Sequence, residues 1–204
     1  MLEFPQLRYQ STRLVSKTLT KSDTNDNLQF FTRKVGDPHR WEWDLTSEPL
    51  EEHEAKAVFA FMASLGGKHG KCYLRNPENT FGQGGGTPRP RAGVQSGENQ
   101  VPLHGLPEGQ DNIYAVGDFI QFSNHDKAYQ VQQFVNSNAH GMAELYLYPK
   151  LRRAVTPQTA LHHGKDVRFC VSLKNDEQDL QLAASQGGWY PMTFDFVEVQ
   201  HEAI

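Results

Sequence analysis

The stretch Arg40-Trp41-Glu42-Trp43-Asp44-Leu45 places a large apolar residue at every second position. Trp41, Trp43 and Leu45 alternate with Glu42 and Asp44, and a period of two is typical of a β-strand with one buried face. We therefore expect the tryptophans to point into a core while the two carboxylates meet solvent. This alternation favours a mainly β fold.

Strand-like segments also lie on the N-terminal side of this stretch. β-Branched and hydroxyl residues dominate residues 11–20, which suits a pleated, half-buried surface. Residues 21–27 are rich in Asp and Asn and predict a turn, and residues 28–35 predict the next strand. Gly36-Asp37-Pro38 predicts a second turn shortly before the tryptophan strand.

After the tryptophan strand the period changes to that of a helix. Between Glu51 and Leu65 the apolar residues recur at helical spacing, and Gly66-Gly67 ends the pattern. This segment predicts one helix of about four turns, with its apolar stripe packed in the core. The stripe consists of Ala55, Val58, Phe59, Met62 and Leu65.

Residues 76–97 are dense in Gly, Pro, Asn and Gln and mark the plainest boundary in the sequence. They follow a short predicted strand at residues 71–75 and include Gly84-Gly85-Gly86. No Lys-Ser or Lys-Thr follows these glycines and no helix is predicted there, so a phosphate-binding loop is not expected. We interpret the stretch as a linker or an exposed loop.

Short strand-like segments without helices follow this boundary and predict a small barrel or sandwich. Two more strands are predicted near the C-terminus, at residues 167–171 and 189–199. The segments of the predicted barrel are residues 100–103, 118–122, 128–131 and 143–148.

Composition and charge argue against several classes of partner. The 204-residue chain has a formal net charge of −4, and its densest basic segment, residues 150–153, holds only three cations, so nucleic-acid binding is not expected. No run of about 18 apolar residues predicts a membrane span, and the N-terminus lacks a signal-peptide pattern. Cys72 and Cys170 each lie in a short apolar run, so we expect two buried thiols and no metal site.

The order of these elements resembles the distal tail protein family of siphophages, and related minor tail proteins, over most of the chain. One matching piece is the tryptophan strand that runs into a helix. The others are Tyr73–Pro77, Val116–Phe122, Leu147–Arg152 and Trp189–Val199. The order and spacing of these pieces carry the resemblance, because each piece alone is a generic strand or helix.

The resemblance implies a mainly β fold with one main α-helix. A ring-forming split β-barrel or sandwich domain, residues 1–75 and 167–204, would carry a small inserted barrel of the oligonucleotide/oligosaccharide-binding (OB) type at residues 76–166. The implied function is that of a structural virion protein of the phage tail tip, assembled in the host cytoplasm. It would form a hexameric ring that joins the tail tube protein to the hub or tip proteins of the baseplate. The family has no catalytic motif to transfer, so we expect neither an enzyme nor a cofactor.

A closed ring repeats one interface in which two different patches meet around a rotation axis. We expect these patches on the polar faces and exposed edges of the early strands. The predicted subunit-contact residues are Arg13, Lys17, Arg33 and Lys34.

An enzymatic function is one alternative. It would need paired carboxylates or a nucleophile with its base. The candidate acids all lie in patterns that a solvated face explains, and the adjacent histidines His162 and His163 would point to opposite faces of a strand. The acids are Glu42, Asp44, Asp118 and Asp195.

Carbohydrate binding is the stronger alternative, because a tail-tip adhesion device meets a cell surface and aromatic side chains of the inserted barrel would stack on sugars. Alternating aromatics in strands are more often core residues or cross-strand pairs. The candidates for stacking are Tyr114, Phe119, Tyr129, Tyr146 and Tyr148.

Overall fold

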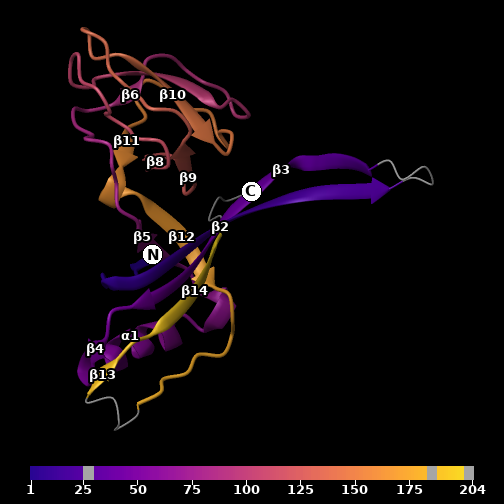
Figure 1. Cartoon of the computed structure of the whole chain (residues 1–204), viewed down its shortest axis with the longest axis vertical. Helices are drawn as coiled ribbons and strands as arrows, with labels where there is room; N and C mark the ends of the chain where they lie inside the picture. Colours follow the sequence, from indigo (N-terminus) through magenta and orange to yellow (C-terminus); the bar gives the residue numbers. More distant parts are fainter. Residues whose placement is uncertain (25–29, 183–187, 200–204) are drawn as a thin grey trace.

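The protein is mainly β, with one α-helix in the part of the chain that the structure describes (Figure 1). The structure is a computed structural model that describes residues 1–24, 30–182 and 188–199, except for the side chains of residues 30–37. The mainly β class predicted from the sequence is confirmed. The helical segments are α1 (Glu52–Ser64) and the 3₁₀ turns η1 (Gly67–His69) and η2 (Gly164–Asp166). The strands are β1 (Leu2–Glu3), β2 (Tyr9–Thr24), β3 (Phe30–Ser47), β4 (Leu50–Glu51), β5 (Cys72–Arg75), β6 (Arg89–Pro90), β7 (Gln100–His104), β8 (Phe119–Phe122), β9 (Ala128–Val131), β10 (Ala143–Tyr148), β11 (Leu161–His163), β12 (Arg168–Leu173), β13 (Trp189–Tyr190) and β14 (Thr193–Glu198).

The strands form two six-stranded sheets and a short ribbon. The first sheet has the order β1-β5-β12-β14-β3-β2 and draws its strands from both ends of the chain. The second sheet has the order β11-β8-β9-β10-β7-β6, and all its strands lie within residues 89–163. It is nearly closed into a barrel, because the Leu161 amide of β11 donates to the Pro88 carbonyl beside β6 at 3.2 Å. The ribbon pairs β13 with β4.

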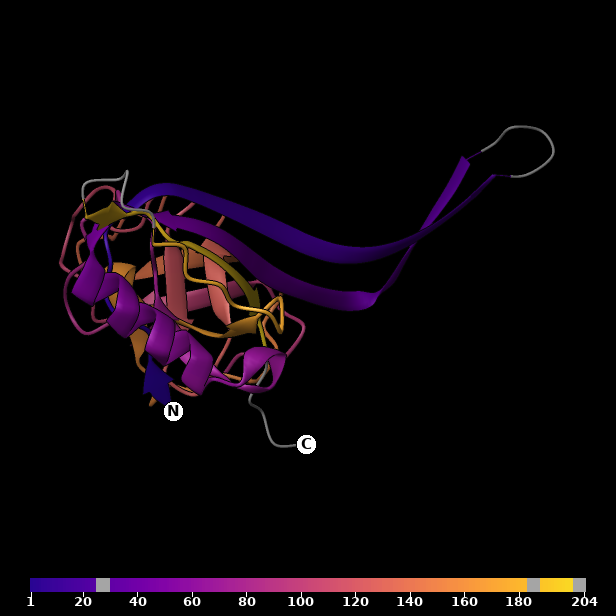
Figure 2. The same ribbon diagram turned by 90° about the horizontal axis from the view of Figure 1, so that it is seen from below.

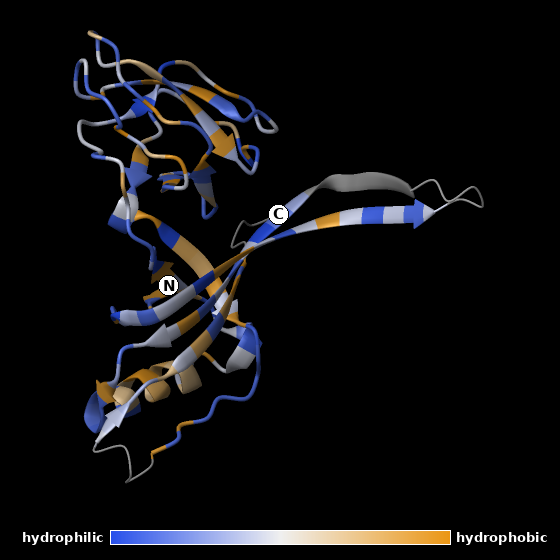
Figure 3. Ribbon diagram, viewed as in Figure 1, coloured by the Kyte–Doolittle hydropathy of each residue, from blue (hydrophilic) through white to orange (hydrophobic). Residues whose placement is uncertain are grey.

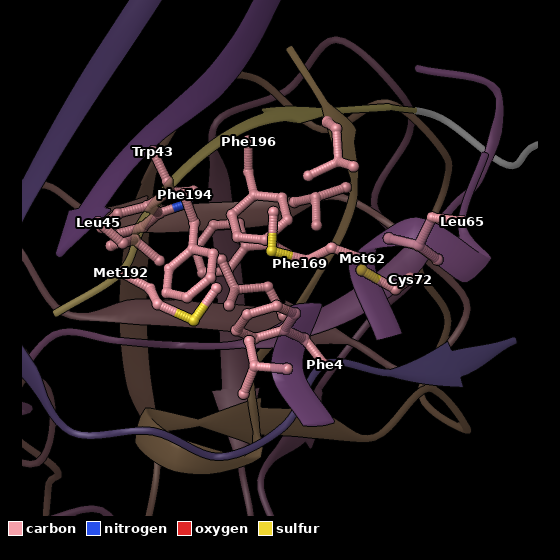
Figure 4. Packing of buried hydrophobic residues seen from close by; sticks show 14 of the residues in the cluster. Phe4, Trp43, Leu45, Met62, Leu65, Cys72, Phe169, Met192, Phe194 and Phe196 are labelled. Carbon is pink, nitrogen blue, oxygen red and sulfur yellow. The ribbon is translucent and has the colours of Figure 1, made fainter. Parts of the chain in front are cut away.

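The tryptophan strand lies inside the first sheet as its alternation predicts. Trp41, Trp43 and Leu45 of β3 are buried, with exposed fractions of 2% or less. Antiparallel pairing places Trp43 opposite Phe196 and Leu45 opposite Phe194 of β14, so both strands present large apolar side chains to one core. Figure 4 shows these rings packed together over α1.

The helix confirms its sequence prediction closely. It begins after Glu51, whose side chain and that of Glu54 form a reciprocal capping box with each other's backbone amides. Ala55, Val58 and Met62 are buried against the first sheet, so the predicted apolar stripe is core packing. The capping box and stripe together fix which face of α1 meets the sheet.

The predicted turn at Gly36-Asp37-Pro38 is wrong. β3 runs without a break from Phe30 to Ser47, and β2 pairs along most of its length. Residues 35–38 instead form an irregularity, because Thr18 pairs with His39 and Thr20 pairs with Lys34. Four residues of β3 therefore stand opposite one residue of β2, which accommodates a glycine and a proline without ending the strand.

The chain leaves the first sheet after β5 and returns to it at β12, which is the neighbour of β5. Arg75, the last residue of β5, pairs with Arg168, the first residue of β12. Between these two positions the chain builds the barrel, which lies at one end of the molecule, opposite α1 (Figure 1). The barrel has its own cluster of buried apolar residues, but Phe119 and Ala128 of the barrel belong to the core of the first sheet.

Candidate assembly surfaces

A long β-hairpin projects from the body of the protein, and we call its outer part the arm. The arm comprises Thr18–Thr24 of β2 and Phe30–Pro38 of β3, and it extends well beyond the other strands of the first sheet and beyond the barrel in two perpendicular views (Figures 1 and 2). All β2 side chains in the arm are exposed. β14 pairs with β3 only as far as Glu42, so the arm strands have no partner in the described chain except each other.

The arm strand β2 is polar apart from single apolar residues, as the hydropathy colouring shows (Figure 3). Its one large apolar residue beyond the body, Leu19, is 51% exposed. An isolated two-stranded hairpin is marginally stable in water, because it buries little on either face. The arm therefore gains little stability from its own contacts.

β2 is also an open sheet edge. It is the terminal strand of the first sheet, and within the described residues only β3 pairs with it. The backbone N–H and C=O groups along its other side are free to pair with a strand of another chain. The opposite edge is β1, which has only two residues.

Arg13 and Lys17, two of the predicted contact residues, lie on the outer face of the first sheet. The side chain of Arg13 is 72% exposed, and its Nη1 donates to Asp44 Oδ2 at 2.6 Å. Lys17 Nζ lies 3.3 Å from Glu42 Oε1, and its side chain is 57% exposed. Both cations are accessible, but each already has a carboxylate partner in its own chain.

Glu42 corrects the prediction of a solvated face. It is only 8% exposed, because Lys17, Arg40 and Lys174 surround its carboxylate. Burial alone would raise its pKa, but hydrogen bonds from Arg40 and Lys17 outweigh burial, so the pKa lies below its usual value. The acid is therefore ionised and held in an ion-pair network, and Asp44 belongs to the same network.

Arg33 and Lys34 lie in the arm. Their backbones pair with those of Lys21 and Thr20 respectively. Their side chains lie outside the described part of the structure. The four predicted contact residues thus occupy one hairpin, two at its base and two in the arm.

A buried ionic cluster joins the base of the arm to the barrel. Lys127, just before β9, donates to Glu198 of β14, and its Nζ lies 3.0 Å from His39 Nδ1 in β3. The side chains of Lys127 and Glu198 are only 1% and 3% exposed. Burial lowers the pKa of Lys127 to about 8 despite its partner, and burial raises the pKa of Glu198.

Hydrogen bonds that involve backbone groups surround this cluster. The Trp41 amide donates to Glu198 Oε2 at 3.0 Å, and the Trp41 indole donates to the Ala128 carbonyl at 3.0 Å. Arg152 of the barrel donates to the His39 carbonyl at 2.7 Å. The barrel therefore holds both the ring and the backbone of His39, the residue where the arm irregularity ends.

Asp118 is a second buried carboxylate that the sequence suggested would be solvated. It is 3% exposed, and its oxygens accept from the amides of Phe81, Gly82 and Ala115 at 2.8–3.0 Å. His163 Nε2 lies 3.0 Å from the same carboxylate. Burial raises its pKa, but these hydrogen bonds outweigh burial and lower the pKa below its usual value.

Asp118 explains the Gly-rich stretch. A Cβ on Gly82 would lie 2.6 Å from Asp118 Oδ2, and a Cβ on Gly86 would lie 2.2 Å from the Gly105 carbonyl oxygen. The stretch around these glycines is therefore an exposed loop, which was one of the two alternatives that the sequence predicts, and Gly82 and Gly86 hold it against the barrel. Close backbone approach is the reason for glycine there.

The other chemical candidates are placed as follows. His162 is exposed whereas His163 turns to Asp118, so the two histidines do point apart. In the described residues, no group of three or more His, Cys, Asp or Glu is arranged to hold a metal ion. Cys72 and Cys170 are both fully buried, as predicted.

Three of the five proposed sugar-stacking aromatics are core residues. Tyr114, Phe119 and Tyr129 are 1% exposed or less, which leaves no ring face for a ligand. Tyr146 and Tyr148 are half-buried. The aromatic pattern of the three buried rings therefore reflects core packing, which is the commoner origin of such patterns.

Comparison with known proteins adds no identity. No protein-family model matches the chain, and no curated protein matches its sequence. Within the described residues, none of the helical segments has the length and apolarity required to cross a membrane.

Proposed function

We propose that this chain is a structural protein of a bacteriophage tail tip, located in the virion, that forms a ring of about six copies between the tail tube and the hub or tip proteins. Such a protein acts through its contacts and needs neither a catalytic centre nor a cofactor. The observation that carries the proposal is the arm together with the open edge of β2. Both are surfaces that one copy of the chain leaves unsatisfied.

A ring supplies what these surfaces lack. In a head-to-tail ring every copy offers one patch and receives a different one, so an arm that projects to one side meets the next copy at each step. A strand from the neighbour would pair with β2 and cover its edge. The charged outer face of the first sheet, with Arg13 and Lys17, would border this contact.

The solution mass of the purified protein tests the proposal. Light scattering should report about six times the chain mass of 23.1 kDa, and negative-stain images should show closed rings. The double variant Arg33→Glu/Lys34→Glu should lose this assembly, because reversed charges in the arm disrupt its docking. Lys150→Glu/Lys165→Glu is the matched control, since both lysines are exposed and lie outside the arm. A strict monomer, alone and with the tube protein added, would refute the proposal.

A further inference from the structure

The arm leaves the body of the protein at an irregularity of the β2–β3 pairing. Thr18 of β2 pairs with His39 of β3, and the next pair is Thr20 with Lys34, so four residues of β3 stand opposite one residue of β2. A bulge bends the strand that carries it and interrupts the ladder of hydrogen bonds. The direction of the arm therefore depends on the contacts made at the bulge as well as on the sheet.

His39 is the residue of β3 on the body side of this irregularity, and the barrel contacts it in three ways. Lys127 Nζ lies 3.0 Å from His39 Nδ1, and Arg152 Nη2 donates to the His39 carbonyl at 2.7 Å. The imidazole also packs edge-on against the ring of Tyr148 in β10, with 4.9 Å between the ring centroids. Only 5% of His39 is exposed. The barrel thus holds both the ring and the backbone of the residue from which the arm departs.

The chemistry of the Lys127 contact assigns the protonation state of the His39 ring. An ammonium group has three donors and no acceptor, so Nδ1 accepts from Lys127. The position of Lys127 Nζ over the Trp41 ring and beside Glu198 suits a cation. This adjacent positive charge opposes a second one on the imidazole. The neutral ring therefore carries its hydrogen on Nε2 and donates it to Ser16 Oγ of β2, which lies 3.0 Å away.

This direction of hydrogen bonding separates the Ser16–His39 pair from a catalytic pair. A serine nucleophile needs a histidine whose Nε2 is free of hydrogen and can take the hydroxyl proton. Here Nε2 holds a hydrogen and donates it to the serine. The ring instead connects the two strands of the hairpin, because it belongs to β3, bonds to β2 and is held by the barrel.

We infer that the barrel sets the direction in which the arm leaves the body, and that His39 is the residue that connects them. Lys127 and Arg152 hold His39 from the barrel side, and the imidazole extends this constraint to β2 through Ser16. The inference goes beyond the proposed ring, because it concerns one copy of the chain and holds whether or not copies assemble.

Distances between spin labels in the arm and in the barrel test the inference. Labels at Ser22→Cys and Glu108→Cys suit this purpose, because both positions are exposed and the two native thiols are buried. Dilution with unlabelled protein keeps the measured distances within one chain. The distribution should be narrow in the otherwise native chain. His39→Phe should broaden it at least about twofold, because phenylalanine keeps a packed ring but can neither accept from Lys127 nor donate to β2.

Ser16→Ala is a milder variant that removes only the link to β2, and it should broaden the distribution less. It keeps the test decisive if His39→Phe does not fold, because Ser16 is exposed. Ser11→Ala is the matched control, since it removes another exposed hydroxyl of β2 and should change nothing. A distribution that is already broad in the native chain, or that stays narrow in Ser16→Ala and in any folded His39→Phe, would overturn the inference.

A second pair of labels separates movement of the arm from movement of the barrel. Lys56→Cys in α1 and Glu108→Cys in the barrel are both exposed, and their distance should not change in either variant. Equal broadening of both distances would show that the barrel itself has loosened and would overturn the inference.

Nitrogen-15 NMR of the imidazole tests the assigned tautomer. At pH 7 Lys127 is still protonated, since burial lowers its pKa only to about 8. The resonances that His39→Phe removes should show a hydrogen on Nε2 and none on Nδ1. A charged ring, or a hydrogen on Nδ1, would contradict the link through Lys127 and overturn the inference.

Discussion

Lys127→Met should destabilise the protein strongly, because it leaves the buried carboxylate of Glu198 without its cation. Lys127 and Glu198 have side chains only 1% and 3% exposed, so water cannot replace the lost partner without opening the contact between the barrel and the first sheet. Removing one partner of a buried ion pair typically costs about 3–5 kcal/mol. The Trp41 amide still donates to Glu198, which places the expected loss near the lower end, at about 3 kcal/mol.

The loss should also depend on pH. Burial already raises the pKa of Glu198 in the folded protein, and without Lys127 the pKa rises further. A carboxyl group whose pKa is higher in the folded protein than in the unfolded chain stabilises the folded state when it is protonated. This contribution is complete only at a pH below the pKa of the unfolded chain, and it is lost as the pH rises through the pKa of the folded protein. The variant should therefore lose less free energy of unfolding at pH 5 than at pH 7.5.

Urea unfolding followed by tryptophan fluorescence measures this loss, since Trp41 packs in the cluster. The double variant Lys127→Met/Glu198→Met should recover most of the stability, because no charge remains unpaired. Lys150→Met is the control and should stay within about 0.5 kcal/mol of the native protein, since Lys150 is exposed. If Lys127→Met costs less than about 1 kcal/mol, or if the double variant is no more stable than the single one, an unpaired buried charge is the wrong explanation.

Three further predictions concern the barrel and the thiols. Asp118→Asn should cost about 2–3 kcal/mol in urea unfolding, because an amide NH₂ cannot accept the backbone hydrogen bonds of the Gly-rich stretch; unchanged stability would contradict that role. Gly86→Ala should lower the urea midpoint more than Gly109→Ala. Both glycines have positive φ, but only a Cβ at position 86 meets a carbonyl oxygen, at 2.2 Å. Cys72 and Cys170 should react with a thiol reagent at pH 8 only after unfolding, since burial raises their pKa to about 12 and about 11; rapid reaction in the native protein would show that they are accessible.

The parts of the fold that the sequence predicts are those governed by local periodicity. Trp41, Trp43 and Leu45 occupy every second position, and this period predicts which face of a strand is buried. The helix is found equally well, because its apolar stripe is closed by Gly66 and Gly67. In each case the signal lies within a few residues of the structure that it predicts.

The predictions fail where a distant partner decides the outcome. Glu42 and Asp118 have the pattern of solvated acids. Lys17 and Lys174 reach Glu42 from distant strands, in addition to the nearby Arg40. The amides of Phe81 and Gly82 reach Asp118 from a distant loop, in addition to the nearby Ala115. Gly36-Asp37-Pro38 has the composition of a turn, yet pairing with β2 carries β3 through it. Local composition cannot report these effects, because the stabilising contacts come from positions far along the chain.

The candidate surfaces show the same division. The sequence predicts Arg13, Lys17, Arg33 and Lys34 as subunit-contact residues from the polar faces of early strands. The structure pairs these two strands as one hairpin, and the contact role stays a prediction. The sequence predicts Trp189 only as part of a strand at residues 189–199. In the structure Trp189 lies in the β13–β4 ribbon, apart from β14, and it is 53% exposed.

Because β5 and β12 are adjacent strands, the whole barrel occupies the place of a hairpin loop. A short turn joining Arg75 to Arg168 would leave the backbone pairing of the first sheet unchanged, so one module could replace another at this point. The replacement has to fill the places of Phe119 and Ala128 in the core of the first sheet. A second constraint is chemical. An incoming module has to bring its own cation to Glu198 and its own acceptor to the Trp41 indole, or the scaffold has to lose that acid. Descendants of such an exchange would therefore show coordinated substitutions at positions 127 and 198, on segments separated by most of the second half of the chain.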